Sequence, residues 1–376
     1  MASSYRVGWI CAVCTEYVAA CELLDEEFPT PPLPSQHYDD NAYTCGRIGE
    51  HKVVVACLPQ GKYGLASAAT VAKDLLRSFP AIQFGLMVGI GGGAPSAKHD
   101  IRLGDVVVTS PTGRTGGVIH YEFGQTIQDK KFDRTGSLSP PPSFLLTALQ
   151  KLSTLHERRG HRIAETVNQM VSNNARLKRY QHPDPRSDVR YKPSFVHADE
   201  KQPCMEICGT GDDRVVHRPA RDPDQDDPVV HYGLIASADR LMSDAHVRDR
   251  LAQTEGVLCF ETEAAGLMDN FRCVVIRGIC DYSDTHKNEL WQGYAAATAA
   301  AYAKELLSVV TQKEINIEVA QSREFFEFIF GLEAAKELTW NSGKGSASAS
   351  TSAMLLQLTR ACSSVESRNL RRWRLF

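Results

Sequence analysis

The segment Val274-Val-Ile-Arg-Gly-Ile-Cys-Asp-Tyr-Ser-Asp284 starts as an apolar run typical of a buried strand and ends in polar side chains. Loops that follow the carboxyl ends of strands commonly hold ligands in α/β sheets, so Arg277 and Asp281 are candidate ligand-binding residues. A carboxyl group in a desolvated cleft can donate a proton, which makes Asp281 a candidate catalytic acid. For Asp284 we expect an ordinary solvated turn.

Apolar runs rich in β-branched residues alternate with helical patterns on the amino-terminal side of this segment and beyond it. We expect strands at residues 5–14, 42–48, 51–58, 84–88, 105–110, 231–237, 258–261 and 273–279. We expect helices at residues 16–28, with Thr15 as N-cap, and at 66–78, 144–156, 264–270 and 291–310. This alternation predicts a three-layer α/β/α domain around a central mixed sheet.

Two stretches differ in composition from this pattern. Residues 157–228 are polar and charge-rich, so we expect a long and partly disordered surface insertion. After about residue 313 an amphipathic segment leads into the low-complexity run GKGSASASTSA and a basic tail. We therefore divide the chain into a main domain at 1–312, with an insertion at 157–228, and an appended segment at 313–376.

The overall composition is that of a globular domain with a substantial core. The formal net charge of −3 gives no reason to expect nucleic-acid or membrane partners, and there is no apolar run long enough to cross a bilayer. Most of the 11 cysteines lie in apolar runs and the N-terminus lacks the features of a secretory signal. Free thiols in a cytoplasmic protein are the expectation.

A glycine run, Gly89-Ile-Gly-Gly-Gly-Ala94, follows the strand expected at 84–88. It fits the dinucleotide fingerprint formally, but Pro95 and a polar loop follow where that fingerprint requires a helix, which disfavours a Rossmann dehydrogenase. Gly89, Gly91 and Gly92 would still let a ligand approach the backbone closely and accept hydrogen bonds from the backbone N–H groups. A tight turn packed under a loop is the competing interpretation.

Acidic residues follow two further strands. Glu261 and Glu263 share one face at the end of the strand at 258–261, with Thr262 between them, and Glu16 follows the first strand. Carboxylates beside an apolar strand can accept hydrogen bonds from the vicinal hydroxyls of a sugar. Acids that favour a helix N-terminus are an equally good explanation of the pair, and Glu16 alone is a weak signal.

A zinc site is conceivable at Cys204 and Cys208 with His197 and His217 nearby. The C-x3-C spacing is atypical and the histidines follow no standard pattern, so we expect no metal and no other cofactor.

The following motifs occur in order along the chain: CAVCTEYVAA, the glycine run, RLGDVVVTS, HYGLIAS, FETEAAGL and VIRGICDYSD. In these motifs the chain resembles the fungal-type members of the nucleoside phosphorylase and nucleosidase superfamily, which includes purine and uridine phosphorylases. The resemblance covers about residues 5–312. It implies a nucleoside phosphorylase-like fold, a small-molecule nucleoside or nucleotide as partner, and a homo-oligomer. Domains of this type also occur in multidomain fungal defence proteins.

The resemblance also implies roles for individual residues. Asp281 would protonate the departing purine, Glu263 with Thr262 and Glu261 would bind the ribose, and Glu16 would activate water. Leu241 and Met242 would form an apolar wall for the base. Cleavage of an N-glycosidic bond through an oxocarbenium-like state is chemically consistent with such acids.

The sequence leaves the nucleophile open. Aliphatic residues occupy the positions around the glycine run where phosphorylases of the family hold phosphate with Arg and Ser, which favours hydrolysis over phosphorolysis. Lys62, Arg114 or Arg240 could instead bind the phosphates of a nucleotide. A phosphate-dependent phosphorylase and a catalytically silent nucleoside-sensing module are the alternatives.

Overall fold

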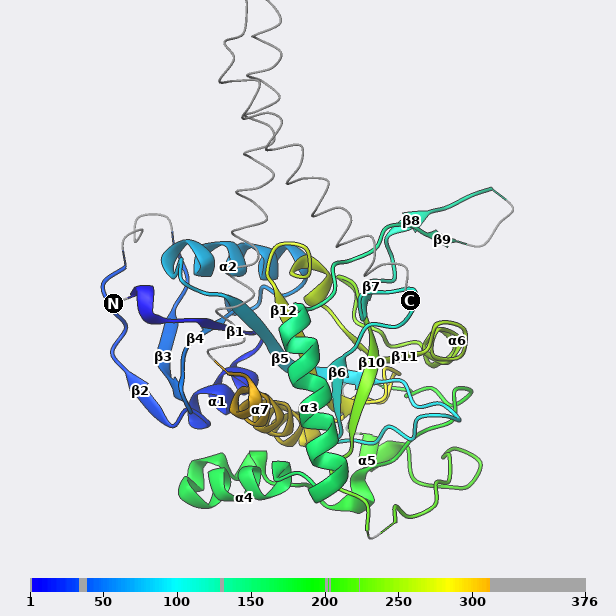
Figure 1. Cartoon of the computed structure of the whole chain (residues 1–376). Helices are drawn as coiled ribbons and strands as arrows, with labels where there is room; N and C mark the ends of the chain where they lie inside the picture. The colour runs from blue at the N-terminus through cyan, green and yellow to red at the C-terminus, as the bar shows by residue number, and fades with distance from the viewer. Residues whose placement is uncertain are drawn as a thin grey trace, which may run out of the picture. The chain divides into compact units, whose positions relative to one another are not determined.

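A computed structural model describes residues 2–33, 39–128, 132–199, 202, 204–222 and 224–311 of the chain (Figure 1). The appended segment expected at 313–376 lies outside these residues. Among the described helices, none has the length and apolar character needed to span a membrane.

The described domain is built on a mixed sheet of ten strands. Its strands are β1 (Val7–Cys11), β2 (Glu26–Phe28), β3 (Tyr43–Ile48), β4 (His51–Cys57), β5 (Phe84–Gly93), β6 (Val106–Thr109), β7 (Val118–His120), β10 (Val230–Ser237), β11 (Val257–Glu261) and β12 (Cys273–Asp281). The order is β11-β10-β6-β12-β5-β1-β4-β3-β2, and β7 pairs with β10. Strand β11 also pairs with β5, so five strands (β5, β12, β6, β10 and β11) close into a barrel. A separate small hairpin is formed by β8 (Gly124–Gln125) and β9 (Asp133–Arg134).

Helices cover both faces of the sheet, as the three-layer prediction requires (Figure 1). They are α1 (Cys14–Glu22), α2 (Leu65–Ser78), α3 (Ser143–Arg159), α4 (Ile163–Asn173), α5 (Cys204–Ile207), α6 (Ala245–Glu255) and α7 (Gln292–Val309). Helix α7 packs on β12 and β5, while α2 packs on the other face against β1. The predicted fold class is confirmed.

The alanine-rich face of α7 allows this helix to approach the sheet very closely. A Cβ atom on Gly278 of β12 would lie 1.8 Å from the carbonyl oxygen of Ala295, so only glycine fits at this crossing. Burial of the side chains of Trp9, Leu86 and Val275 beneath the helices completes the core. The strand that carries Arg277 and Asp281 is thus covered by α7 and paired with β5 and β6 along its two edges.

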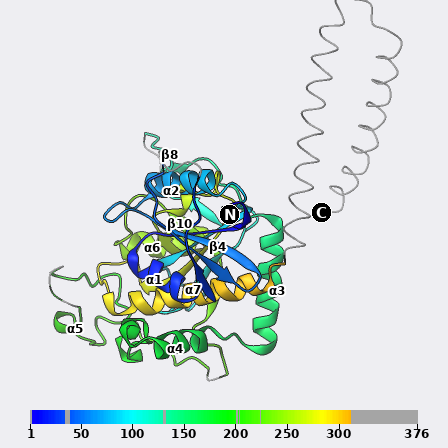
Figure 2. The same ribbon diagram turned by 90° about the vertical axis from the view of Figure 1, so that its left-hand side faces the viewer.

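The expected insertion at 157–228 differs from the prediction because much of it folds onto the domain. Helix α4 lies along α7 (Figures 1 and 2) and buries Ile163 and Val167. The 3-10 turns at Ala175–Tyr180 and Pro185–Ser187 follow, and Trp291 donates its indole N–H to Ser187 Oγ at 3.0 Å. The polar composition of the insertion as a whole hid the apolar stripe on one face of α4.

Two predicted helices are also corrected. The helix expected at 16–28 begins at Cys14 and ends at Glu22, and Val13 occupies the N-cap position in place of Thr15. Residues Glu26–Phe28 form β2, because they pair with β3 from further along the chain. The helix expected at 264–270 is a short 3-10 turn, Ala264–Gly266. Local propensity cannot report such long-range pairing.

Candidate active site

A buried arginine on β12 gathers three glutamates from two other parts of the chain. Arg277 is fully buried, and its Nη2 donates to Glu261 and lies 3.3 Å from Glu263 Oε2. Its Nη1 lies 3.9 Å from Glu16 Oε1. Burial disfavours the charged guanidinium, but the three carboxylates outweigh it and raise the pKa of Arg277 above its usual value. We call Arg277, Glu16, Glu261 and Glu263 the arginine cluster.

Glu16 reaches the arginine cluster from the first turn of α1. Its Oε2 accepts the backbone N–H groups of Ala12 at 2.6 Å and Val13 at 3.1 Å, which ties the carboxylate to the start of the helix. Its Oε1 accepts the N–H of Ile90 at 2.7 Å. Burial raises the pKa of Glu16 to about 7 in spite of the nearby Arg277 charge. The carboxyl group of Glu16 therefore has its pKa near neutral pH.

The two other carboxylates are fixed by the turn that follows β11. Glu261 accepts N–H groups from Glu263 at 3.1 Å and Ala264 at 3.0 Å, so part of its role is to cap this turn. Glu263 accepts the N–H of Gly64 at 3.3 Å and the hydroxyl of Thr262. Burial raises the pKa of Glu263 despite Arg277. The contacts of Glu261 show the capping role, whereas a role of the pair in binding a sugar stays a prediction.

Asp281 ends β12 and lies apart from the arginine cluster. Its Oδ1 accepts the N–H of Ser283 at 2.7 Å, and its Oδ2 lies 3.1 Å from Lys287 Nζ. Lys287 also donates to the carbonyl of Met242 at 3.4 Å, which connects Asp281 to the segment between β10 and α6. Sequence reasoning missed Lys287, since a lysine six residues after an acid carries no recognisable signal.

The glycine run makes room for these acids instead of opening a helix. It forms the end of β5, and a Cβ on Gly89 would lie 2.2 Å from Glu16 Oε1 and 2.6 Å from Arg277 Nη1. A Cβ on Gly92 would lie 2.7 Å from Asp281 Oδ1. Gly91 faces the backbone of Phe260 on β11. The glycines thus belong to a strand, neither to the tight turn of the competing interpretation nor to the start of a helix, and this supports the argument against a dinucleotide site.

A small hollow lies beside Asp281. Its lining includes several of the predicted residues, namely Gly92, Leu241, Met242, Glu261, Thr262 and Asp281, together with Phe260, Ser283 and Lys287. Its volume of about 10 Å³ suffices for about one water molecule. Glu16, Glu263 and Arg277 do not border the hollow. The predicted residues therefore form two adjoining groups, joined through Glu261.

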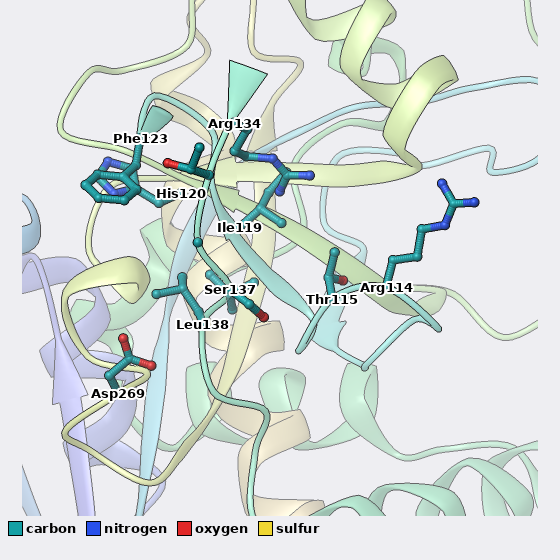
Figure 3. Close-up of a pocket in the computed structure, with 12 residues that line it drawn as sticks. Arg114, Thr115, Ile119, His120, Phe123, Arg134, Ser137, Leu138 and Asp269 are labelled. Atoms are coloured by element: carbon teal, nitrogen blue, oxygen red, sulfur yellow. The ribbon is translucent and has the colours of Figure 1, made fainter. Parts of the chain in front are cut away.

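A larger hollow of about 370 Å³ lies elsewhere, against β7 and the segment 134–138 (Figure 3). The rings of His120 and Phe123 stack along its wall with centroids 5.7 Å apart. Asp269 is the acid that lines it, and this carboxylate accepts the N–H and hydroxyl of Ser139. Because the lining includes neither Asp281 nor the arginine cluster, its size does not make it the better candidate for glycosidic chemistry.

The cations considered for a substrate phosphate lie away from the small hollow. Arg114 lines the larger hollow, and Arg240 pairs with Glu122 at 2.5 Å. Lys62 is exposed on the segment before α2. Asp284, expected in a solvated turn, is in fact buried, where Arg248 Nη1 lies 3.4 Å from its Oδ2.

The residues weighed as zinc ligands are partly brought together. Side-chain atoms of His197, Cys204 and Cys208 lie within 4.8 Å of one another. His217 lies elsewhere, where its Nε2 pairs with Asp212 at 2.9 Å. The geometry thus runs against the expectation of no metal, which rested on sequence spacing.

The barrel-forming mixed sheet flanked by helices is the fold of the nucleoside phosphorylases and nucleosidases. Futalosine hydrolase of Helicobacter pylori is similar over 81% of this chain and 98% of its own, with a TM-score of 0.50 and 14% identity. The 5′-methylthioadenosine/S-adenosylhomocysteine nucleosidase of Neisseria meningitidis, in complex with methylthio-immucillin-A, gives a TM-score of 0.50 at 16% identity, over 80% of this chain and 98% of its own.

Residues 6–312 match the sequence profile of the Phosphorylase superfamily, and the chain belongs to this superfamily. The resemblance predicted from the motifs is confirmed. A nucleotide-binding leucine-rich repeat (NLR)-like protein of Hyaloscypha variabilis is 45% identical over 315 residues, which are 83% of this chain. The chain spans 30% of the length of that relative.

Proposed function

We propose that the chain hydrolyses the N-glycosidic bond of a purine nucleoside or nucleotide. The observation that carries the proposal is the buried Glu16, whose pKa is raised to about 7, in one cluster with Glu261 and Glu263. A general base works best when its pKa lies near the working pH. Membership of a superfamily that includes nucleoside-cleaving enzymes supports the same reaction.

Different side chains would act on the ribose and on the base, the two parts that the N-glycosidic bond joins. Cleavage develops positive charge on the ribose, which the carboxylate of Glu263 stabilises, and negative charge on the base, which a proton from Asp281 removes. Thr262 and Glu261 would orient the sugar by accepting hydrogen bonds from its hydroxyl groups. In this scheme Arg277 contacts no substrate, and its role is to hold the carboxylates in position.

The nucleophile in this proposal is water. Glu16 uses three of about four acceptor positions on backbone N–H groups, which leaves one for a water molecule. Leu86 and Val88, buried on β5 before the glycines, offer no charge to a phosphate ion. Arg277, the cation beside the glycines, is already engaged by carboxylates. These contacts favour hydrolysis over phosphorolysis.

Substrate entry would require one wall of the small hollow to move. Small-molecule sites usually have volumes of about 300–1,000 Å³, far above the volume beside Asp281. Leu241 is 68% exposed on the segment between β10 and α6, and Lys287 bridges this segment to Asp281. We therefore expect a base to enter by displacing Leu241 and Met242 outward and breaking the Lys287 bridge.

The test is release of free base from a panel of nucleosides and nucleotides, with and without inorganic phosphate. In phosphate-free buffer we expect free ribose from a nucleoside, and from a nucleotide the ribose that still carries the phosphate of the substrate. Asp281→Asn should lower kcat at least about 100-fold, whereas Asp213→Asn, an exposed acid paired with Arg214, should not. Ribose 1-phosphate formed only with phosphate would identify a phosphorylase. Binding without release of base would identify a silent sensor.

The role in a longer protein is a further part of the proposal. An NLR-like relative contains a region 45% identical to this chain, so we propose that the domain can serve as an effector or sensor module of a multidomain protein. A homo-oligomeric state remains a prediction, to be checked by light scattering.

A further inference from the structure

The cluster of His197, Cys204 and Cys208 lies in the folded part of the insertion, outside the candidate active site. Cys204 begins the one-turn helix α5 and Cys208 directly follows its last residue, with the N–H of Cys208 donating to the carbonyl of Cys204 at 2.9 Å. Residues four apart on a helix share a face, so both thiols point to the same side. This explains how a C-x3-C spacing can present two sulfur atoms to one point.

The histidine is oriented toward both thiols. His197 Nδ1 lies 3.1 Å from Cys208 Sγ and 3.5 Å from Cys204 Sγ. In a tetrahedral zinc site with Zn–S of about 2.3 Å and Zn–N of about 2.0 Å, the sulfur and nitrogen ligands are separated by about 3.5 Å. The three atoms are therefore already near the spacing that one zinc ion requires.

The other ring nitrogen of His197 is held as zinc ligands usually are. Nε2 lies 3.0 Å from the carbonyl oxygen of Gln202, which makes it an N–H donor and leaves the lone pair on Nδ1 for the thiols. Metal-binding histidines typically donate their second N–H to a carbonyl or carboxylate in this way. The backbone N–H of His197 also donates to Thr285 Oγ1 at 2.9 Å, so the histidine is anchored to the loop after β12.

That loop supplies a second buried histidine. His286 is 7% exposed, its Nδ1 lies 3.6 Å from Asp284 Oδ1, and its Nε2 has no hydrogen-bond partner among the described residues. Its ring centroid lies 5.8 Å from that of His197, whereas two histidines on one tetrahedral zinc have centroids about 5 Å apart. His286 is not among the residues whose ligand atoms lie within 4.8 Å of one another, so its ring would have to move toward the ion. Asp284, the nearby acid, is already engaged by Arg248 and by the N–H of His286. Nε2 is therefore the nitrogen of His286 that is left to bind a ligand, since a buried polar atom without a partner is costly.

We propose that His197, Cys204, Cys208 and His286 bind one structural zinc ion. Four protein ligands leave no open position, which is the mark of a structural and not a catalytic site. The surrounding apolar cluster is small, with Tyr191, Cys208 and Val215 as its buried members, and so little hydrophobic burial holds this part of the insertion. Metals commonly stabilise units whose core is too small. The ion would fix the insertion to the Thr285–Lys287 loop, independently of which reaction the domain catalyses.

The direct test is metal analysis of the full chain, reduced and purified without chelator. About one zinc per chain is expected, bound through two sulfur ligands at about 2.3 Å and two nitrogen ligands at about 2.0 Å by X-ray absorption at the zinc edge. This measurement needs no variant. Zinc without sulfur ligands would be an adventitious ion and would overturn the proposal, as would a chain that takes up no zinc after incubation with the metal.

Variants then assign the ligands one by one. Cys204→Ser, Cys208→Ser and His197→Ala should each lower zinc affinity at least 10-fold in competition with a chromophoric chelator, and His286→Ala should do the same. Cys21→Ser and His217→Ala are the matched controls and should keep the parental affinity. Circular dichroism of each variant with and without zinc separates loss of the site from loss of the fold. Unchanged affinity in either cysteine variant overturns the site, and unchanged affinity in His286→Ala overturns the fourth ligand.

Discussion

Replacement of Arg277 by Met tests whether the arginine cluster is held together as the structure has it. The substitution keeps most of the side-chain volume but leaves the carboxylates of Glu16, Glu261 and Glu263 buried without their cation. Removal of one partner from a buried ion pair typically costs about 3–5 kcal/mol. For a domain of about 300 residues that corresponds to a decrease in Tm of roughly 5–8 °C.

The dependence on pH makes this prediction specific. Burial already raises the pKa of Glu16 and Glu263 above their unfolded values, and loss of Arg277 removes a group that lowers them. A group with a raised pKa in the folded state loses its stabilising effect as pH rises through that pKa. The destabilisation by Arg277→Met should therefore be larger at pH 8 than at pH 5.

Urea unfolding of the parent and variant at both pH values measures these quantities. Arg47→Met is a suitable control, because Arg47 pairs with Glu26 at 3.3 Å on an exposed edge strand and such pairs contribute at most about 1 kcal/mol. A loss below about 1 kcal/mol for Arg277→Met at pH 8 would contradict the buried cluster. An equal loss at both pH values would show that the carboxylates do not carry the effect.

Three further predictions concern the acids and the glycine run. If Glu16 is the general base, release of the nucleobase should decrease as pH falls below about 7, because the pKa of Glu16 is about 7. Glu16→Gln should abolish this pH dependence together with most of the activity, and pH–rate profiles of the two proteins test both points. Glu263→Gln should lower kcat more than it raises KM, since its charge is needed in the oxocarbenium-like state; steady-state kinetics would reveal a pure KM effect as evidence against that role. Gly89→Ala should destabilise the chain by about 1–3 kcal/mol, because its Cβ would lie 2.2 Å from Glu16 Oε1, whereas Gly113→Ala, with open space around it, should change the midpoint of thermal unfolding very little.

The strands and the acids at their ends were accessible to sequence reasoning because each depends on local pattern. The apolar run at 273–279 is β12, and the strands expected at 42–48 and 51–58 are β3 and β4, which pair antiparallel. Helix α6 was missed, although Asp244 caps its start by accepting two N–H groups and Gly256 ends it in a left-handed conformation. The few apolar residues of α6 show no clear helical periodicity, and without that periodicity the two caps alone did not lead to a helix prediction.

The contacts that depend on distant residues could not be predicted. The pairing of β11 with β5, which brings Phe260 opposite Gly92, has no local signature. The same holds for the role of Arg277, expected to contact substrate and found among three carboxylates, and for His286, which lies 78 residues after Cys208 in the sequence. Spacing rules for metal sites address ligands from one segment, so a site shared between two segments escapes them.

The way the sheet ends also affects how copies of the chain meet one another. Unpaired strand edges are templates for aggregation through intermolecular pairing. At one end this edge is removed, because β11 bonds to both β10 and β5. At the other end the sheet stops at β2, which has three residues and exposes the acidic side chains of Glu26 and Glu27. Because Glu26 is paired with Arg47, only Glu27 among the described residues of this edge leaves an uncompensated charge, but an edge of three residues offers a second chain few backbone groups to pair with, which disfavours edge-to-edge polymerisation.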